Sequence, residues 1–122
     1  MKDYSAMSDF EINKAVAIHL GMKPFDEETG WQGLTKEPYV DVVVRGAGRL
    51  GAFNPCNKPA DTWPIIFRER ITLTPKVTGY EWDAISPVIL NDDIEHLHTG
   101  PNPLRSAMVV FLMMKDRESS HV

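Results

Sequence analysis

Cysteine is nearly absent from this chain, because Cys56 is the only one among 122 residues. A single cysteine forms no internal disulfide and builds no cysteine-based zinc site within one chain, so a secreted disulfide scaffold is excluded. Long apolar runs are also missing. The longest, Met108–Met114, is far shorter than the roughly 20 residues that cross a bilayer. Met1–Met7 is polar and no apolar signal segment follows it, so a reduced, cytosolic setting is expected.

Positive charge is not in excess. The chain has 13 Lys and Arg against 17 Asp and Glu, a formal net charge of −4. This balance disfavours non-specific binding to nucleic acid or to membrane surfaces, and no basic recognition helix is visible. The length predicts one domain, residues 1–122, with one core and flexible ends at 1–7 and 116–122.

Capping residues predict three helices. Ser8 and Glu11 form a capping box, Asp61 is expected to cap a second helix with Pro64 in its first turn, and Asn102 precedes a proline at the start of the third. The predicted helices run from Ser8 to Leu20, from Thr62 to about Arg70, and from Asn102 onward. The last is apolar on nearly every side, so we expect it to be the buried centre, with one face available to a subunit interface.

Strands are predicted by β-branched and alternating segments between these helices. They lie at Tyr39–Val44, Ile71–Thr74 and Tyr80–Ile85, with shorter candidates at Trp31–Leu34 and Val88–Leu90. Lys23–Gly30 and Asn91–Gly100 are expected to be loops. The order of elements predicts an α+β fold: a small antiparallel sheet of about four strands with helices on both faces, an α/β/α sandwich.

The most unusual segment is Asn54–Ile66, which combines three prolines, two asparagines, the cysteine, an aspartate and a tryptophan. A polar, proline-fixed segment that leads into a helix suits a ligand-facing wall, and helix N-termini attract anions. An aromatic ring with amides and an arginine suits a nucleobase and a phosphate. We expect Trp63 to pack in the core but retain it as a candidate. The candidate ligand contacts are Trp31, Asn54, Asn57, Asp61, Trp63, Asn102 and Arg105.

Other motifs favour structural interpretations. Gly46–Gly51 matches G-x-G-x-x-G, yet the residues after it do not open a helix, so we interpret it as a turn. His96 and His98 lack the spacing of helical zinc sites and are assigned to an acidic loop. Cys56 is expected to be a buried loop residue, and His19 a packed or interface histidine. A salt bridge with Asp61 is the structural alternative for Arg105.

Three segments together resemble a known family. They are Ser8–Lys14, Phe53–Ile66 and Asn102–Met114, which carry the Phe-Asn-Pro-Cys-Asn, Trp-Pro-Ile-Ile and Asn-Pro-Leu-Arg motifs. They are similar to the NinX-like family of small accessory phage proteins, and distantly to phage ABA-sandwich domains. Residues 22–52 match this pattern poorly. The resemblance implies a phage origin, action in the host cytoplasm and a role against the host, and it transfers no catalytic motif.

Three functions are therefore considered. The favoured one is a non-catalytic, homo-oligomeric binder that sequesters a nucleotide-derived host immune signal. The alternative is a protein-interaction module that inhibits a host or phage protein, with an exposed apolar helix surface as its expected feature. The third is a small enzyme that degrades a cyclic nucleotide through His96 and His98. No cofactor, metal or catalytic residue is predicted.

Overall fold

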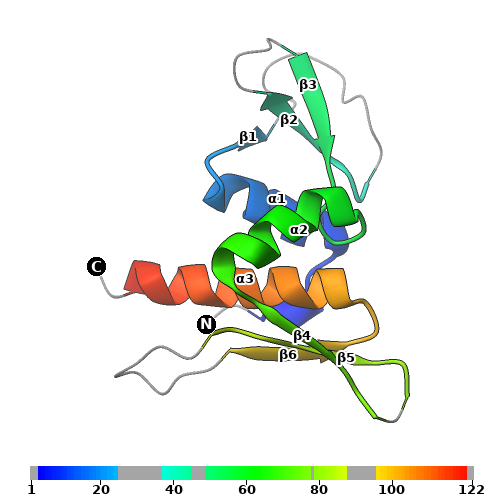
Figure 1. Ribbon diagram of the computed structural model, residues 1–122. Coiled ribbons are helices and arrows are strands. Elements are labelled where there is room, and N and C mark those ends of the chain that lie inside the picture. The colour runs from blue at the N-terminus through cyan, green and yellow to red at the C-terminus, as the bar shows by residue number, and fades with distance from the viewer. Residues whose placement is uncertain (1–2, 25–36, 45–48, 78, 88–95, 121–122) are drawn as a thin grey trace. The chain divides into compact units, whose positions relative to one another are not determined.

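The computed structural model describes residues 3–24, 37–44, 49–77, 79–87 and 96–120 (Figure 1). The chain divides into two compact units, Met1–Asn54 and Pro55–Val122. The α+β class is confirmed, because the described residues form three α-helices and antiparallel strands. One sheet of about four strands was expected, whereas each unit has a three-stranded sheet of its own. The single domain and the α/β/α sandwich stay predictions.

The first unit begins with a short 3-10 helix and one α-helix. Its elements are η1 (Tyr4–Ala6), α1 (Asp9–His19), β1 (Lys23–Pro24), β2 (Val40–Val44) and β3 (Arg49–Phe53). The predicted capping box is confirmed: Ser8 Oγ accepts from the Glu11 backbone N–H at 3.1 Å. Gly21 follows the helix at φ 80°, a conformation that glycine adopts without a Cβ penalty.

The sheet of this unit pairs β2 with both of its neighbours. β1 and β3 lie antiparallel on either side, and the register of the β2–β3 pair joins Val40 to Phe53 and Val44 to Arg49. Lys23–Pro24 is therefore a strand where a loop was expected. Gly46–Gly51 was expected to be a turn or the end of a long hairpin, and its residues from Arg49 onward lie in β3. Because strand β3 contains the second half of the glycine motif and the two residues after it, no helix opens there, and the interpretation against a dinucleotide loop is confirmed.

The buried side of α1 packs on β1 and β2. Ile12, Val16 and Ala17 are fully buried, as expected for an apolar stripe at helical spacing. His19 is exposed, so it is not packed within the chain, and its alternative role as an interface histidine stays a prediction. Asn13 takes a buried place on this side instead. The reason is helical geometry, since residues 12, 13, 16 and 17 share one face and His19 falls beyond its edge.

The second unit contains two helices and the second sheet. Its elements are α2 (Pro59–Glu69), β4 (Thr72–Pro75), β5 (Trp82–Ile85), β6 (Leu97–Gly100) and α3 (Pro103–Ser120). β5 is the central strand and pairs antiparallel with β4 and β6. Strand β6 corrects the loop predicted for the end of Asn91–Gly100, because Ala84 and Ile85 of β5 pair with His98 and Leu97. Trp31–Leu34 and Val88–Leu90 lie outside the described residues.

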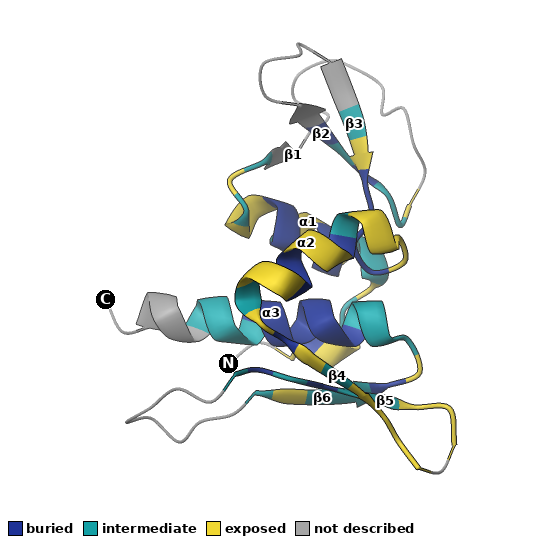
Figure 2. Ribbon diagram, viewed as in Figure 1, coloured by how far each residue is buried: buried dark blue, intermediate teal, exposed yellow. Residues whose placement is uncertain are grey.

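Helix α3 forms the core of this unit. Every residue from 106 to 112 is buried (Figure 2), which confirms the central role predicted from its all-round apolar sequence. It contacts the strands β4–β6 and also α2, so α2 packs on α3 rather than on the sheet. Burial of each large apolar side chain here contributes roughly 1.5–3 kcal/mol. The helix continues to Ser120.

Candidate functional site

Helix α2 starts earlier than its sequence suggested. Lys58 is the N-cap and makes no side-chain capping bond, and Pro59 is the first helical residue. Asp61 therefore lies in the first turn and is not the cap, which corrects the prediction. Thr62 supports this start, because its buried hydroxyl donates to the carbonyls of Pro55 and Lys58. Pro64 consequently lies inside the helix.

The two sides of α2 differ in an unusual way. Thr62, Ile65 and Ile66 are buried. The opposite side is exposed, yet it is apolar as well, and it consists of Ala60, Trp63, Pro64 and Phe67. This spacing of i, i+3, i+4 and i+7 places the four residues on one stripe. We call this stripe the α2 face.

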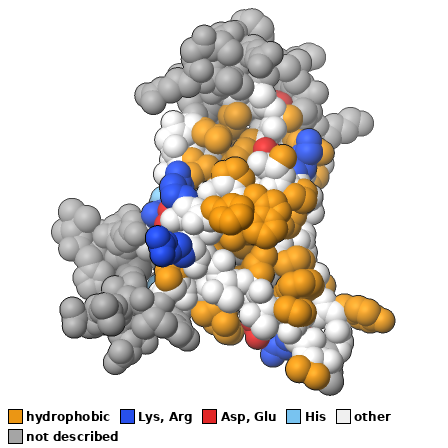
Figure 3. All heavy atoms as spheres, in the orientation of Figure 1, with side chains coloured by type: hydrophobic (Ala, Val, Ile, Leu, Met, Phe, Trp, Pro, Cys, Tyr) orange, Lys and Arg blue, Asp and Glu red, His pale blue; other side chains and the backbone are white. Residues whose placement is uncertain are grey.

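Two aromatic rings dominate the α2 face. Trp63 is 46% exposed and Phe67 is 75% exposed. Their ring centroids lie 5.4 Å apart and their planes are tilted by 34°, a contact typical of aromatic pairs. In the space-filling view the hydrophobic surface gathers over α2 (Figure 3). The expectation that Trp63 packs in the core is wrong, because the isoleucines occupy the buried side.

Sequence reasoning missed Phe67 altogether. Its signal was present in the chain, because an aromatic residue four positions after Trp63 falls on the same helix side. Because Ile65 and Ile66 are buried in the core, Trp63 and Phe67 on the opposite side of the helix face outward. The two apolar stripes of α2 are therefore visible in the sequence, but only once the helix bounds are known.

The turn before α2 is tied to the start of α3 by Asn102. Its Nδ2 donates to the Cys56 carbonyl at 2.7 Å and to Asn57 Oδ1 at 3.3 Å. Its Oδ1 accepts from the backbone N–H groups of Leu104 and Arg105 at 3.0 and 3.2 Å. The predicted N-cap is confirmed. Asn102 thus uses both ends of its amide in the fold, and its contact with a ligand stays a prediction.

The remaining candidates in the second unit differ in exposure. Asn57 is exposed, while Asp61 and Arg105 are half-buried. Nη1 of Arg105 is itself buried, so the guanidinium points into the protein and not at an open surface. The pairing of Arg105 with Asp61 stays a prediction. Cys56 is fully buried in the turn after Pro55, as expected.

Asn54 is a structural residue of the first unit. It is 2% exposed, and its Oδ1 accepts from Asn13 Nδ2 at 2.8 Å. The same Nδ2 donates to the Pro38 carbonyl at 2.8 Å. A buried amide that satisfies one buried and one part-buried acceptor stabilises the fold, so Asn54 has a structural role, and its contact with a ligand stays a prediction. Trp31 lies outside the described residues.

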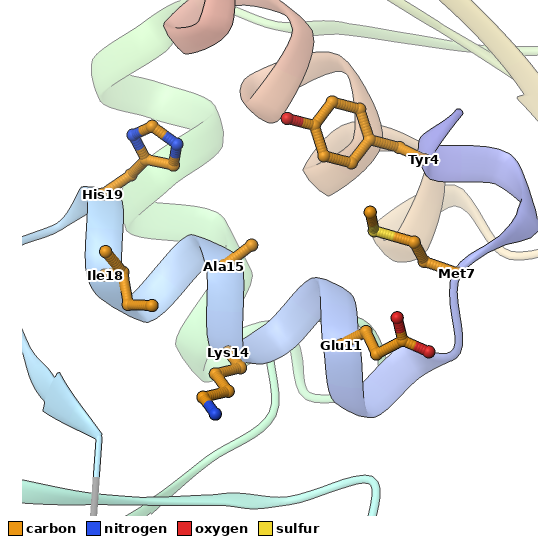
Figure 4. A pocket seen from close by; sticks show the side chains of 7 residues that line it. All are labelled: Tyr4, Met7, Glu11, Lys14, Ala15, Ile18 and His19. Atoms are coloured by element: carbon orange, nitrogen blue, oxygen red, sulfur yellow. The ribbon is translucent and has the colours of Figure 1, made fainter. Parts of the chain in front are cut away.

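A hollow of about 280 Å³ lies along α1 in the first unit. Met7, Ala15 and Ile18 give it an apolar lining, and Glu11, Lys14 and His19 add polar groups (Figure 4). Ile18 is 56% exposed at its edge. Glu11 already takes part in the capping box. The hollow contains none of the residues that the sequence nominated for ligand binding.

The two histidines of the third hypothesis lie at β6. His98 Nδ1 is 3.0 Å from Ser106 Oγ on α3, and the His96 backbone pairs with Ser86. Within the described ranges, no group of three or more His, Cys, Asp or Glu side chains is placed to hold a metal ion. The acidic residues 91–95 lie outside these ranges, so the acidic loop itself stays a prediction.

Comparison with known families decides the origin of the chain. A sequence profile described as "Bacteriophage P22, NinX" matches residues 3–115. The chain belongs to this NinX family. The match runs through residues 22–52 as well, so the stretch that resembled the family poorly is also part of it. No curated protein matches the chain.

Membership of the NinX family identifies a phage accessory protein. It confirms the resemblance drawn from the Asn54–Ile66 and Asn102–Met114 segments. Among the described residues, no helix combines the length and hydrophobicity needed to cross a membrane. Among the described residues, the α2 face is an exposed apolar stripe that packing of the core does not require.

Proposed function

We propose that this NinX-family protein is a non-catalytic interaction module, which acts in the infected host's cytoplasm by binding another protein through the α2 face. The single observation that carries the proposal is the exposed aromatic pair Trp63–Phe67 on a helix whose opposite side is already buried. Large exposed aromatics are costly to leave in water, and they dominate the energetics of protein interfaces.

The arrangement of α2 supports a protein partner. Apolar anchors at i, i+3, i+4 and i+7 are the pattern with which a helix lies against a groove or another helix. Exposed Arg68 lies at the edge of this face, and arginine is enriched at interface centres together with tryptophan. Because α2 packs on α3 through the isoleucine side, binding at its outward side requires no change in the core.

The test is affinity capture from infected cells with three baits. The first is the unaltered protein, the second carries Trp63→Ser and Phe67→Ser, and the third carries Val77→Ser and Tyr80→Ser. Val77 and Tyr80 are 102% and 93% exposed, so the third bait removes exposed apolar surface elsewhere in the same unit. We expect one partner to be retained by the first and third baits and lost by the second. Equal recovery by all three baits would refute the proposal.

A second candidate is sequestration of a nucleotide-derived immune signal. The observation that favours it is the first turn of α2, where Lys58 supplies no side-chain cap and exposed Asn57 stands beside it. Asp61 and Thr62 donate their N–H groups to the Lys58 carbonyl, so what attracts a phosphate here is the positive end of the helix dipole, and Trp63 offers a stacking ring one turn further on. Asn54 and Asn102 make hydrogen bonds within the fold, and their contact with a ligand stays a prediction.

Thermal denaturation with linear and cyclic nucleotides, including ADP-ribose isomers, tests this second candidate. A ligand at 100 times its dissociation constant stabilises the folded state by about 2.7 kcal/mol. Sequestration predicts a rise in melting temperature with one nucleotide class, recovery of that nucleotide intact, and loss of the rise in Trp63→Ala. An unchanged melting temperature across the panel removes the candidate and leaves the protein-binding function.

A further inference from the structure

The large and small side chains of the α2 face are spaced so that they fit those of the same face on a second molecule. We propose that a second copy of this chain covers the α2 face, with the two α2 helices antiparallel. A two-fold axis between Trp63 and Pro64 places each large side chain opposite a small or flat one: Phe67 faces Ala60 of the other copy, and Trp63 faces Pro64. A parallel arrangement instead places Phe67 against Phe67 and Trp63 against Trp63, which packs bulk against bulk.

The charges at the edge of the α2 face favour the same arrangement. Asp61 and Arg68 are seven residues apart, nearly two helical turns, so they lie on the same edge of the face. In an antiparallel two-fold pair, an edge meets the same edge of the other helix, as at antiparallel coiled-coil positions. Asp61 of each copy therefore lies beside Arg68 of the other. The other edge carries Pro59 and Arg70, which bring no like charges together.

The existing contact of Arg68 is compatible with this pairing. Arg68 Nη2 is 3.6 Å from Glu69 Oε1, but the Arg68 side chain is still 60% exposed. The Glu69 carboxylate is held more closely by Lys115, whose Nζ lies 2.9 Å away. Since Lys115 already neutralises Glu69, the Arg68 guanidinium can turn to a carboxylate of a second copy without leaving an isolated charge.

We infer that self-association on this face also regulates binding of the partner. This regulatory role rests on the proposed function. A dimer buries Trp63 and Phe67, so the partner and the second copy compete for the same residues. One 11-residue helix supplies less surface than the roughly 800 Å² per partner of a standard interface. The dimer is therefore expected to dissociate in the micromolar range, which lets a tighter partner displace it.

Sedimentation velocity over a concentration series tests the pairing through charge reversal. We expect the unaltered protein to dimerise as its concentration rises. Asp61→Arg places two arginines side by side, and Arg68→Asp places two aspartates side by side, so each variant sediments as a monomer at concentrations where the unaltered protein dimerises. An equal mixture of the two variants pairs opposite charges at both contacts and recovers the dimer. Single variants that dimerise as before, or a mixture that stays monomeric, would overturn the proposal.

A second pair of variants covers the case in which a charge reversal at half-buried Asp61 disturbs folding. Phe67→Asp alters a side chain that is 75% exposed, and Tyr80→Asp alters one that is 93% exposed. We expect a monomer for the first and a dimer for the second, with circular dichroism unchanged in both. A Phe67→Asp variant that still dimerises would overturn the proposal.

Failure of this proposal and failure of the proposed function give different results. If the protein is monomeric at every concentration but the bait with Trp63→Ser and Phe67→Ser still loses the partner, self-association is wrong and the proposed function stands. If charge reversal behaves as predicted and no bait retains a partner, the dimer stands and the protein-binding function is wrong.

Discussion

Replacement of Asn102 by alanine tests whether this residue belongs to the fold or to a ligand site. Alanine removes the N-cap bonds to Leu104 and Arg105 and the 2.7 Å bond to the Cys56 carbonyl. Loss of an N-cap costs about 1 kcal/mol, and loss of a part-buried hydrogen bond costs about 1–2 kcal/mol more. We therefore expect Asn102→Ala to lower the free energy of unfolding by about 2–3 kcal/mol. Urea denaturation measures this loss, and the m-value should stay unchanged.

Two further variants separate the contributions. Asn102→Ser keeps a capping oxygen but loses the donor to Cys56, so its loss should be about half that of alanine. Asn57→Ala alters the neighbouring exposed amide, whose contact with Asn102 is 3.3 Å, and should stay within about 0.5 kcal/mol of the unaltered protein. If Asn102→Ala is as stable as Asn57→Ala, the structural assignment of Asn102 is refuted.

Three other substitutions have expected outcomes that equilibrium unfolding measures. Asn13→Ala leaves the part-buried Pro38 O and the buried Asn54 Oδ1 without their shared donor, and should destabilise the protein by about 2–4 kcal/mol; a loss below about 1 kcal/mol would contradict the assigned bonds. Thr62→Val keeps the side-chain shape but removes the hydroxyl bonds at the start of α2, with an expected loss of about 1–2 kcal/mol, and no loss would show that the hydroxyl does not hold this start. Arg70→Gly relieves a left-handed residue at φ 57° and should stabilise the protein by up to about 1 kcal/mol; destabilisation would mean that the arginine side chain outweighs the backbone strain.

Local capping chemistry made two helix starts predictable. Ser8 with Glu11, and Asn102 with the proline after it, satisfy backbone N–H groups with residues only two or three positions away. Such signals depend on no distant part of the chain. The burial of α3 was equally accessible, since a helix that is apolar on every side can only lie inside.

The start of α2 was not predictable by the same rule. Two prolines, Pro59 and Pro64, each suit a first turn, and Asp61 suits an N-cap between them. The structure chooses the earlier start, where the Thr62 hydroxyl bonds to the carbonyls of Pro55 and Lys58. N-cap preferences rank aspartate above lysine. The hydrogen bonds of the Thr62 hydroxyl therefore outweigh the N-cap preference at this helix start.

The side of α2 that faces outward was also beyond local reasoning. The helix has an aliphatic stripe with Ile65 and Ile66 and an aromatic stripe with Trp63 and Phe67, and hydrophobicity does not decide between them. In the folded unit α2 packs on α3, and Ile65 and Ile66 are buried. The role of Asn54 was hidden for a similar reason, because its partner Asn13 lies 41 residues away.

Site-specific photo-crosslinking in infected cells tests most directly whether another protein surface covers the α2 face. A benzophenone amino acid replaces Phe67 in one protein and Tyr80 in another, since both side chains point into solvent. We expect protein adducts at position 67, including one of twice the chain's mass, and none of these at position 80. Absence of adducts at 67, or the same adducts at both positions, would contradict this expectation.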